Sequence, residues 1–417
     1  MSSLRDGPRD SSLAFAAQGY EFIGRLCDRL GADAVPTRLL LRRTVVMRGA
    51  EAARLFYDDR LFRRQGAMPL RVRRTLLGRG GVQGLDGAQH HARKAMFLEL
   101  LTPEAAQEVA ALFVAHWRTR LPRWEDAEQV VVMEEMGEGL CAAISEWAGL
   151  PVSGLALSRR TRDLEALVDS AGRLGPGYWR GVLARRRAER RLGRLLRRVR
   201  TGQLRPPARV LARLASHQDE PGGAPLPPRV AAVELLNLLR PAVAIERYIA
   251  FTALALHEHP KLRDRLRGAG DDERERFVQE VRRYHPFFPA LAAVTETPVV
   301  VAGQDVPRHC RVLLDIYGTN RDPRTFPDPG SFDPDRFLEP PGEFAFIPQG
   351  GGDPALGHRC PGEPLTVEVM KAAVGVLVDE LDYEVPPQDL QVSTRRMPTG
   401  PASGFVVTRV RRRPAVS

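Results

Sequence analysis

The chain has 417 residues, a formal net charge of +11 and 43% hydrophobic residues, which is ample for a sizeable core. No apolar run is long enough to span a bilayer, and the opening segment MSSLRDGPRD lacks the apolar core of a signal peptide, so no transmembrane segment is expected. The four cysteines form no CxxC pair, which argues against a zinc site or a disulfide framework and favours a cytoplasmic location.

Nearly all the basic residues are arginines, and their positive field attracts anions such as nucleic acid, acidic lipid, an acidic electron-transfer partner or an anionic substrate. The run at 178–200, YWRGVLARRRAERRLGRLLRRVR, is strongly basic and helical. Nucleic-acid or membrane binding is one interpretation of this run. Because it has little aromatic interleaving beyond Tyr178 and Trp179, it offers no evident base-stacking platform, and we expect a solvated surface helix.

The first half of the chain reads mainly as helix, with one region of strand. The β-branched residues at 44–46 indicate one or two strands over 38–47, and glycines make 75–87 a loop. Pro122 and the glycine–proline–glycine sequence at 175–177 are expected to interrupt the helices. The helices expected in this half are 13–30, 51–57, 88–101, 104–147 with its break, and 178–200.

The second half contains one long, mostly apolar helix over 230–257, which follows a loop rich in proline and glycine at 216–228. Pro241 lies well inside this helix and should kink it, because proline removes one backbone hydrogen bond. Strands alternate around a turn near Gly303 over 298–316. No linker clearly divides the chain, which fits one large helical domain.

A cation is embedded in the long apolar helix. Arg240 has no acidic residue at the positions three and four away, where side chains share its face. An arginine on an apolar stretch must reach solvent or find a partner, because burying an unpaired charge is very costly. A surface position or a long-range ion pair is the simpler alternative to a functional role. The four neighbours are Leu236, Asn237, Val243 and Ala244.

The most informative stretch runs over 344–374 and surrounds a single cysteine, Cys360. Pro361 follows that cysteine and suits a first helical turn, and apolar residues then repeat at helical spacing. Backbone N–H groups and the dipole at a helix start favour a thiolate, which can ligate a metal or act as a nucleophile with His358 as its base. A buried structural cysteine is the alternative. The glycines of the loop are at 350, 351, 352, 357 and 362.

One set of loop residues resembles the haem-binding loop of the cytochromes P450. The set is Phe346, Gly350, His358, Cys360 and Gly362. The resemblance implies haem b (iron protoporphyrin IX) as the cofactor, with Cys360 as the axial ligand of the iron. The segment between Phe346 and Cys360 is longer than usual, a feature associated with the fatty-acid peroxygenase branch of this family.

Further matches precede the cysteine loop in the order the family has them. Glu280 and Arg283 form an ExxR pair on a helix, and 320–337 resembles the segment that contributes Arg336 to a Glu280–Arg283–Arg336 network. Alone, ExxR is a common pattern of charged helices. In this order, the resemblance implies a single haem-thiolate domain over 1–417 with the cytochrome P450 fold, mainly α with small β-sheets.

The central helix departs from most members of the family in a way that has a functional meaning. Most members carry an acid–alcohol pair there, whereas this chain has Arg240 and Pro241. The pair resembles that of the hydrogen-peroxide-dependent fatty-acid peroxygenases, where it binds the substrate carboxylate. The resemblance implies hydroxylation of long-chain fatty acids at the alpha or beta carbon, with the paired carboxylate as general acid–base and no obligatory redox partner.

Four basic residues are candidates to bind the haem propionates. His90 and Lys94 are four residues apart and share a helix face, where they resemble the family's HxxxR-like pair with lysine at the second position. Arg64 and His358 are the other two candidates. For His90 and Lys94 the simpler alternative is a solvated, basic helix start.

The position of Gln83 bears on the reaction outcome. It resembles a position that is glutamine in hydroxylating peroxygenases and histidine in a decarboxylating relative that makes terminal alkenes. Hydroxylation is therefore expected, with fatty-acid decarboxylation as an alternative. The residues expected to line the substrate channel are Leu77, Phe287, Phe288, Ala290 and Leu291.

Two further alternatives stay open from the sequence. One is a monooxygenase fed by a redox partner through NAD(P)H, because the basic surface could dock an acidic ferredoxin. The other is non-enzymatic, a haem sensor or a nucleic-acid-binding protein that uses the run at 178–200. We expect fatty acid and hydrogen peroxide to be the partners, and no nucleic acid.

Overall fold

The computed structural model describes residues 10–150, 152–206 and 208–414. Most of the regular structure is helical, which confirms the fold class predicted from the sequence. The helices are α1 (Ser12–Gln18), α2 (Phe22–Leu30), α3 (Ala50–Phe56), α4 (Leu70–Val72), α5 (Gly87–Leu100), α6 (Pro103–Arg118), α7 (Leu121–Asp126), α8 (Val132–Trp147), α9 (Gly154–Asp169), α10 (Gly175–Arg200), α11 (Arg209–Ser216), α12 (Pro228–Ala244), α13 (Glu246–Glu258), α14 (Pro260–Leu266), α15 (Asp271–Tyr284), α16 (Ile316–Thr319) and α17 (Glu363–Gly375).

The strands form small sheets. The largest has the order β1-β2-β8-β5-β3, in which β2 and β8 run parallel and the other neighbours run antiparallel. In the second sheet β10 lies between β4 and β9, and β6 pairs with β7 in a hairpin. The strands are β1 (Ala34–Leu39), β2 (Arg42–Met47), β3 (Phe62–Arg63), β4 (Val130–Val131), β5 (Ala290–Thr295), β6 (Val299–Val301), β7 (Gln304–Val306), β8 (Arg311–Asp315), β9 (Leu381–Glu384) and β10 (Val406–Arg412).

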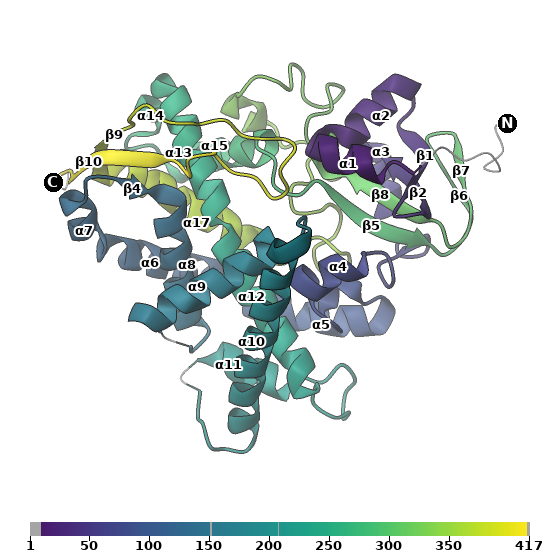
Figure 1. Cartoon of the computed structure of the whole chain (residues 1–417), viewed down its shortest axis with the longest axis horizontal. Helices are drawn as coiled ribbons and strands as arrows, with labels where there is room; N and C mark the ends of the chain where they lie inside the picture. The colour runs from purple at the N-terminus through teal and green to yellow at the C-terminus, as the bar shows by residue number, and fades with distance from the viewer. Residues whose placement is uncertain (1–9, 151, 207, 415–417) are drawn as a thin grey trace.

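The sheets and helices occupy different parts of the molecule. Figure 1 shows the five-stranded sheet with α1, α2 and α3 at the right, and the long helices through the left and lower parts. The strand β10 lies at the opposite end from β1 (Figure 1). The helix α17, which follows the cysteine loop, packs against α6 and α15 between these regions.

The expected helix over 13–30 is divided in two. A 3-10 turn over Gly19–Glu21 separates α1 from α2, and Gly19 adopts a φ of 60°. A Cβ at Gly19 would overlap the carbonyl oxygen of Thr394, so glycine permits both the left-handed φ and the close approach of the two backbones.

The strand region expected over 38–47 is a hairpin that begins earlier, at Ala34. Leu40 and Leu41 form its turn, both exposed and with φ of 52° and 60°. Two leucines are unusual in a turn with positive φ, because glycine and asparagine adopt it more readily. These two residues therefore carry no signal that predicts the turn.

Two prolines expected to interrupt helices instead lie in the first turns of new ones. Pro122 is near the start of α7, and Pro176 is near the start of α10, which includes Gly175. The first N–H groups of a helix have no intrahelical acceptor, so a proline there removes no hydrogen bond. The interruptions therefore fall just before these residues rather than at them.

The long central helix consists of α12 and α13, separated at Ile245. The N–H of Ile245 donates to the Ala242 carbonyl at 3.3 Å, a tighter turn than α-helix. Pro241 lies inside α12, four residues before the break, so the discontinuity is displaced from the position expected for it. The residues of α12 and α13 are almost all buried, which places this element at the centre of the largest hydrophobic core.

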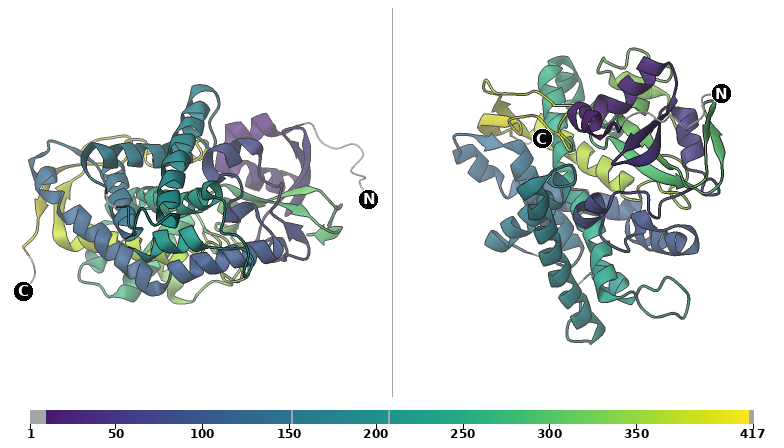
Figure 2. Two further views of the ribbon diagram at one scale, coloured as in Figure 1. Left: turned by 90° about the horizontal axis from the view of Figure 1, so that it is seen from below. Right: turned by 45° about the vertical axis from the view of Figure 1, so that its right-hand side comes forward.

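The long basic helix α10 packs against α9 and α12 (Figure 2). Its Val182, Leu192 and Leu196 are buried, while most of its arginines are exposed. The helix is therefore amphipathic, with one face on the core. Within the described ranges, no helix combines the length and apolarity needed to cross a membrane.

Candidate active site

Cys360 lies at the end of a glycine-rich loop, directly before α17. Its N–H donates to the Gln349 carbonyl at 2.9 Å, and its own carbonyl accepts from Glu363 at 3.3 Å. Gly350 has a φ of 103°, which only glycine adopts without strain. Pro361 was expected in the first helical turn, but α17 begins at Glu363, so Pro361 belongs to the loop. The loop thus fixes the cysteine by backbone hydrogen bonds on both sides.

The sequence predicted that the helix start would favour a thiolate at Cys360, but the surroundings of this cysteine favour the neutral thiol. Burial raises the pKa of the Cys360 thiol, and the opposing effects of the Gly362 N–H and of Lys94 do not outweigh it. The start of α17 alone therefore does not generate a thiolate, because desolvation disfavours the charged form. A metal ion bound to the sulfur would reverse this, since a coordinating thiol is deprotonated.

Side chains from two other helices hold the cysteine loop. Lys94 on α5 donates to the Gly357 carbonyl at 3.0 Å and also to the carbonyl of Arg359. Arg282 on α15 binds the Gln349 side chain at 3.0 Å and the carboxylate of Glu363. The sequence analysis missed Arg282, although it lies beside the ExxR pair.

The other predicted propionate ligands surround one side of the loop. The imidazole rings of His90 and His358 stack with centroids 3.8 Å apart, and burial lowers the pKa of His90 to about 4. The guanidinium of Arg64 lies over the Phe56 ring, 4.0 Å from its centroid. Nη1 of Arg64 and Nδ1 of His90 are buried and have no hydrogen-bond partner in the described residues. The Arg64 nitrogen is thus a buried donor that lacks an acceptor, and the His90 nitrogen can donate beside it in one tautomer.

Arg240 is buried in α12, where its charge has no carboxylate partner among the described residues. Its Nη2 lies 3.5 Å from Asn237 Oδ1, and its Nε has no partner there. Burial, together with Arg185, lowers the pKa of Arg240 to about 9, which still leaves it charged at neutral pH. Cys360 acts on the same pKa in the opposite direction, so the two residues are within electrostatic reach.

A polar network missed by the sequence analysis supports Arg240. Asn237 Nδ2 donates to Glu234 at 2.7 Å and to Gln83 Oε1 at 3.2 Å, which leaves Oδ1 for Arg240. Glu234 also accepts from the N–H of Val82 at 2.9 Å and from Arg93. Glu234 is six residues from Arg240 and so lies off the helix face of that arginine. The available signal was that Asn237 lies three residues from each of them.

Three of the five predicted channel residues lie together near Arg240. Leu77, Phe287 and Phe288 pack around a cluster that includes Ala244, one turn after Arg240 in α12. Ala290 and Leu291 are on β5 and pack against two other clusters, at the N-terminal helices and at the main sheet. The structure therefore brings an apolar lining to Arg240 but does not place Ala290 and Leu291 in that cluster.

The predicted charge network is also formed. Nε and Nη2 of Arg283 donate to the two oxygens of Glu280, at 2.6 and 2.7 Å, and both side chains are fully buried. Arg336 Nε lies 3.7 Å from Glu280, and its terminal nitrogens bind the carbonyls of Pro327 and Asp328. The network thereby ties α15 to the segment before the cysteine loop.

Comparisons with known proteins were consistent with this geometry. The Cytochrome P450 family model matches residues 275–410. Among curated proteins, "Carnosic acid synthase" of Rosmarinus officinalis is 33% identical over 26% of this chain and 22% of that protein. "Geraniol 8-hydroxylase" of Swertia mussotii is 34% identical over 28% of this chain and 25% of that protein. The matched part thus spans about a quarter of the length of these relatives.

Solved structures match nearly the whole chain. A variant of cytochrome P450SP alpha (CYP152B1) is 43% identical, with a TM-score of 0.94 over 97% of this chain and 100% of that chain. The chain belongs to the cytochrome P450 family. Cytochrome P450EX alpha (CYP152N1), solved with myristic acid, is 39% identical to this P450, with a TM-score of 0.93 over 98% of both chains. A variant of cytochrome P450 OleT, in complex with arachidonic acid, is 33% identical, with a TM-score of 0.94 over 99% of both chains.

Haem b is the cofactor of this P450, and the residues present fit it. Cys360 is partly buried and supplies a sulfur of the kind that a P450 uses as axial ligand. Two propionate carboxylates need hydrogen-bond donors. Nη1 of Arg64 is an unpartnered donor, and Nδ1 of His90 is unpartnered and donates in one tautomer. The nitrogen of Lys94 already binds two loop carbonyls, so its role in this structure is to hold the loop.

The buried ExxR pair of this P450 gives a stability prediction. Glu280→Ala should lower the free energy of unfolding by about 3–5 kcal/mol, because it leaves the charge of Arg283 buried without its carboxylate. Urea denaturation of the haem-loaded protein measures the change. Glu273→Ala is the matched control on α15, since Glu273 pairs with Arg265 in a partly exposed position and should cost at most about 1 kcal/mol. Equal destabilisation by the two substitutions would contradict the prediction.

Proposed function

We propose that this P450 is a fatty-acid peroxygenase, which uses hydrogen peroxide to hydroxylate long-chain fatty acids at the alpha or beta carbon. The observation that carries the proposal is Arg240, a buried cation with no carboxylate partner in the described part of the chain, beside an apolar cluster and within electrostatic reach of Cys360. A carboxylate with a long apolar tail complements both features. The similar structures solved with myristic acid and with arachidonic acid support this choice of ligand.

Arg240 is proposed to bind the substrate carboxylate. Its planar guanidinium can form two parallel hydrogen bonds with a carboxylate, which fix orientation as well as position. Pro241 cannot donate a backbone hydrogen bond, so it leaves the Asn237 carbonyl free of its usual helical partner next to the site. The chain Glu234–Asn237–Arg240 holds the guanidinium in place.

The bound carboxylate then serves as the general acid–base. It accepts a proton from one oxygen of hydrogen peroxide and donates it to the departing oxygen, which leaves as water. The other oxygen enters a C–H bond of the substrate, so peroxide and fatty acid give a hydroxy acid and water. Arg240 keeps the carboxylate oxygen at the site throughout, and no titratable side chain of the protein is needed for this proton transfer.

Haem b, held by Cys360, would supply the chemistry that breaks the O–O bond and oxidises carbon, with the thiolate favouring O–O cleavage. We assign the propionates to Arg64 and His90, with His358 stacked on His90. Because Arg240 would hold the carboxylate end of the substrate at the site, the alpha and beta carbons would be the substrate atoms closest to the reaction centre.

Gln83 favours hydroxylation over decarboxylation in this proposal. Its Oε1 accepts a hydrogen bond from Asn237, so it belongs to the network that positions Arg240. Its amide does not titrate, and it therefore cannot exchange a proton with an intermediate as histidine could. Leu77, Phe287 and Phe288 would cover the first part of the substrate chain.

We also propose that the chain acts as one haem-thiolate domain in the cytoplasm, without an obligatory redox partner and without nucleic acid. The four cysteines are free, which fits a reducing compartment. Peroxide carries both the oxygen atom and the oxidising equivalents, so the proposed reaction consumes no electrons from a reductant.

The test compares two oxidant supplies with one substrate. Purified, haem-loaded protein is incubated with myristate and either hydrogen peroxide or NADPH with a ferredoxin system, and the products are separated by mass. We expect hydroxymyristate with peroxide alone. Product formed only with the electron-donor system would replace this proposal with a partner-dependent monooxygenase, and a terminal alkene as main product would indicate decarboxylation.

A further inference from the structure

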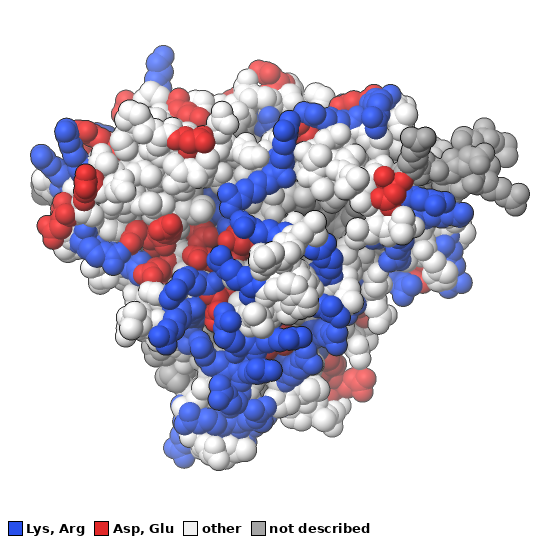
Figure 3. Space-filling model, in the orientation of Figure 1, with Lys and Arg blue, Asp and Glu red and all other residues white. Residues whose placement is uncertain are grey.

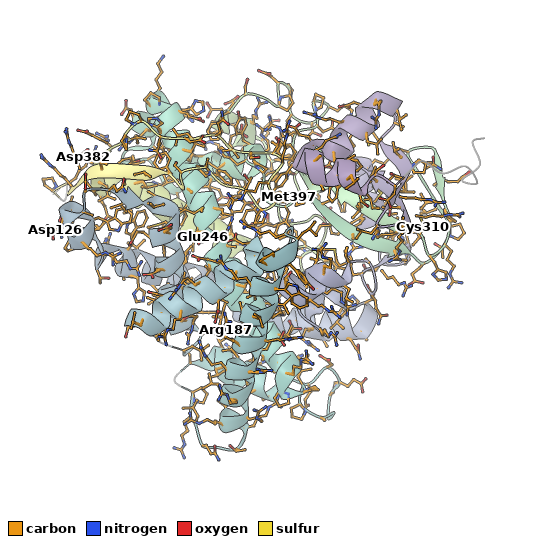
Figure 4. The ribbon with its side chains drawn as sticks, viewed as in Figure 1. Asp126, Arg187, Glu246, Cys310, Asp382 and Met397 are labelled. Atoms are coloured by element: carbon orange, nitrogen blue, oxygen red, sulfur yellow. The ribbon has the colours of Figure 1, made fainter. Side chains whose placement is uncertain are left out.

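One face of α10 carries an unusual density of uncompensated positive charge. Figure 3 shows basic side chains gathered over this helix and its surroundings in the lower half of the molecule. Among the described residues, only one exposed arginine of α10 forms an ion pair with a carboxylate, Arg187 with Asp163 (Arg187 is labelled in Figure 4). The exposed arginines are Arg180, Arg186, Arg187, Arg190, Arg191, Arg194, Arg197 and Arg198. We call this set the arginine face.

The helix itself supplies no counter-charge to this face. Glu189 is its acidic residue, and it is occupied by Arg185 on the buried side, at 2.7 Å, and by Arg229 of α12. Arg186, Arg190 and Arg194 follow one another at four-residue spacing, so they line one stripe, and like charges at this spacing repel. An anionic surface that covers the stripe would offset this repulsion between the arginines.

The N-terminal end of the same helix exposes large apolar side chains. Leu174, Trp179 and Leu183 are 71%, 55% and 50% exposed. Isolated exposed leucines are ordinary. Here Leu174 directly precedes α10, and Trp179 and Leu183 lie beside Arg180 in the first turns of this amphipathic helix. Tryptophan and leucine beside arginine is the composition of helices that lie in a membrane interface.

This end of α10 is also joined to the turn that carries the predicted channel residue Leu77. Arg185 Nη1 donates to the carbonyls of Thr75 and Leu76, at 3.1 and 2.9 Å. Arg71 donates to the Arg173 carbonyl at 2.8 Å, just before α10. A surface bound to this end would therefore lie near the outer side of the apolar cluster beside Arg240.

We propose that the arginine face and the apolar residues Leu174, Trp179 and Leu183 dock the protein on an anionic lipid bilayer. Phosphate headgroups would neutralise the arginines, and the apolar side chains would enter the interface. Nucleic acid would satisfy the arginines but not the two leucines. Binding to the bilayer does not depend on the proposed reaction. The purpose that we give to this binding, direct uptake of fatty acid from the membrane, does rest on the proposed function.

The experiment uses the full-length, haem-containing protein and two kinds of vesicle, phosphatidylcholine alone and phosphatidylcholine with phosphatidylglycerol. Trp117, Trp124 and Trp147 are buried, so Trp179 is the one exposed tryptophan of the four in the chain. We expect cosedimentation with the anionic vesicles only, a blue shift of tryptophan emission, and loss of that shift in Trp179→Phe. Absence of wild-type binding to anionic vesicles would overturn the proposal, as would binding to duplex DNA alone.

Two triple variants with the same change in net charge distinguish binding through the arginine face from a general effect of net charge on vesicle binding. Arg186→Glu, Arg190→Glu and Arg194→Glu together should weaken vesicle binding roughly 100-fold. The control changes three exposed arginines on remote elements, Arg29, Arg43 and Arg308, to glutamate and should bind nearly as wild type. Equal weakening in both variants would contradict a docking face. Since vesicle binding is measured without turnover, its failure is distinguishable from failure of the proposed reaction.

Discussion

Arg240→Ala should reduce peroxide-driven hydroxylation of myristate by roughly a thousandfold, while the absorption spectrum of the haem-loaded protein stays that of the wild type. The substitution removes the guanidinium that is proposed to bind the substrate carboxylate, so the carboxylate can no longer act as the general acid–base. It changes neither Cys360 nor the loop that holds Cys360. Arg240→Lys should recover only part of the activity, because an ammonium lacks the planar fork. Hydroxylation at wild-type rate by Arg240→Ala would refute the substrate-assisted mechanism.

A small acid separates the two tasks given to the substrate carboxylate. A short carboxylic acid, too small to fill the channel, should pair with Arg240 and supply the acid–base group for a second, non-carboxylated substrate. Wild-type protein should then oxidise that substrate with peroxide, and Arg240→Ala should not. If the acid had no effect on the wild type, the carboxylate would be needed only for binding.

Thiolate-ligated haem has a characteristic absorption when it is reduced and binds carbon monoxide. Cys360→Ala should abolish this absorption and all peroxide-driven hydroxylation. No other cysteine can replace it, because Cys27, Cys141 and Cys310 are buried in other parts of the molecule. Cys310→Ala is the matched control and should retain the absorption, since Cys310 lies in the main-sheet core. Retention of the absorption by Cys360→Ala would rule out this cysteine as the ligand.

The cysteine loop and the cation of the central helix could be predicted because both are local signals. Glycines around Cys360 require a tight turn in any fold, and Arg240 has no acidic neighbour at helical spacing however the helix packs. The protonation preference of Cys360 could not be predicted, because it depends on how much protein covers the sulfur. Burial opposes the effect of the adjacent helix start and prevails.

The network behind Arg240 shows why contact through an intermediate residue escapes sequence reasoning. Glu234 is off the face of Arg240, and only the amide of Asn237 connects them. Arg93 on α5 donates to the same carboxylate of Glu234. The two residues are far apart in sequence, so helical periodicity cannot predict this contact. The hairpin turn at Leu40 was missed for a different reason. The N–H groups of Leu40 and Leu41 donate to the side chains of Ser12 and Asp10, which are remote in sequence.

The break of the central helix illustrates the limit of proline as a signal. Pro241 removes one donor, and the sequence places the kink there. The structure keeps Pro241 within α12, and the hydrogen-bond pattern also changes at Ile245, four residues later. Ala244, next to that break, packs with Leu77, Phe287 and Phe288, so the altered turn lies at the apolar part of the site.

The central claim, that peroxide is the oxidant and Arg240 binds the substrate, is tested most directly by the origin of the oxygen atom in the product. Wild-type protein is given myristate and isotopically labelled hydrogen peroxide in air, and the hydroxymyristate is analysed by mass spectrometry. The account predicts one labelled oxygen in the new hydroxyl group, at the alpha or beta carbon. An unlabelled hydroxyl group, or a hydroxyl group placed far from the carboxylate, would contradict it.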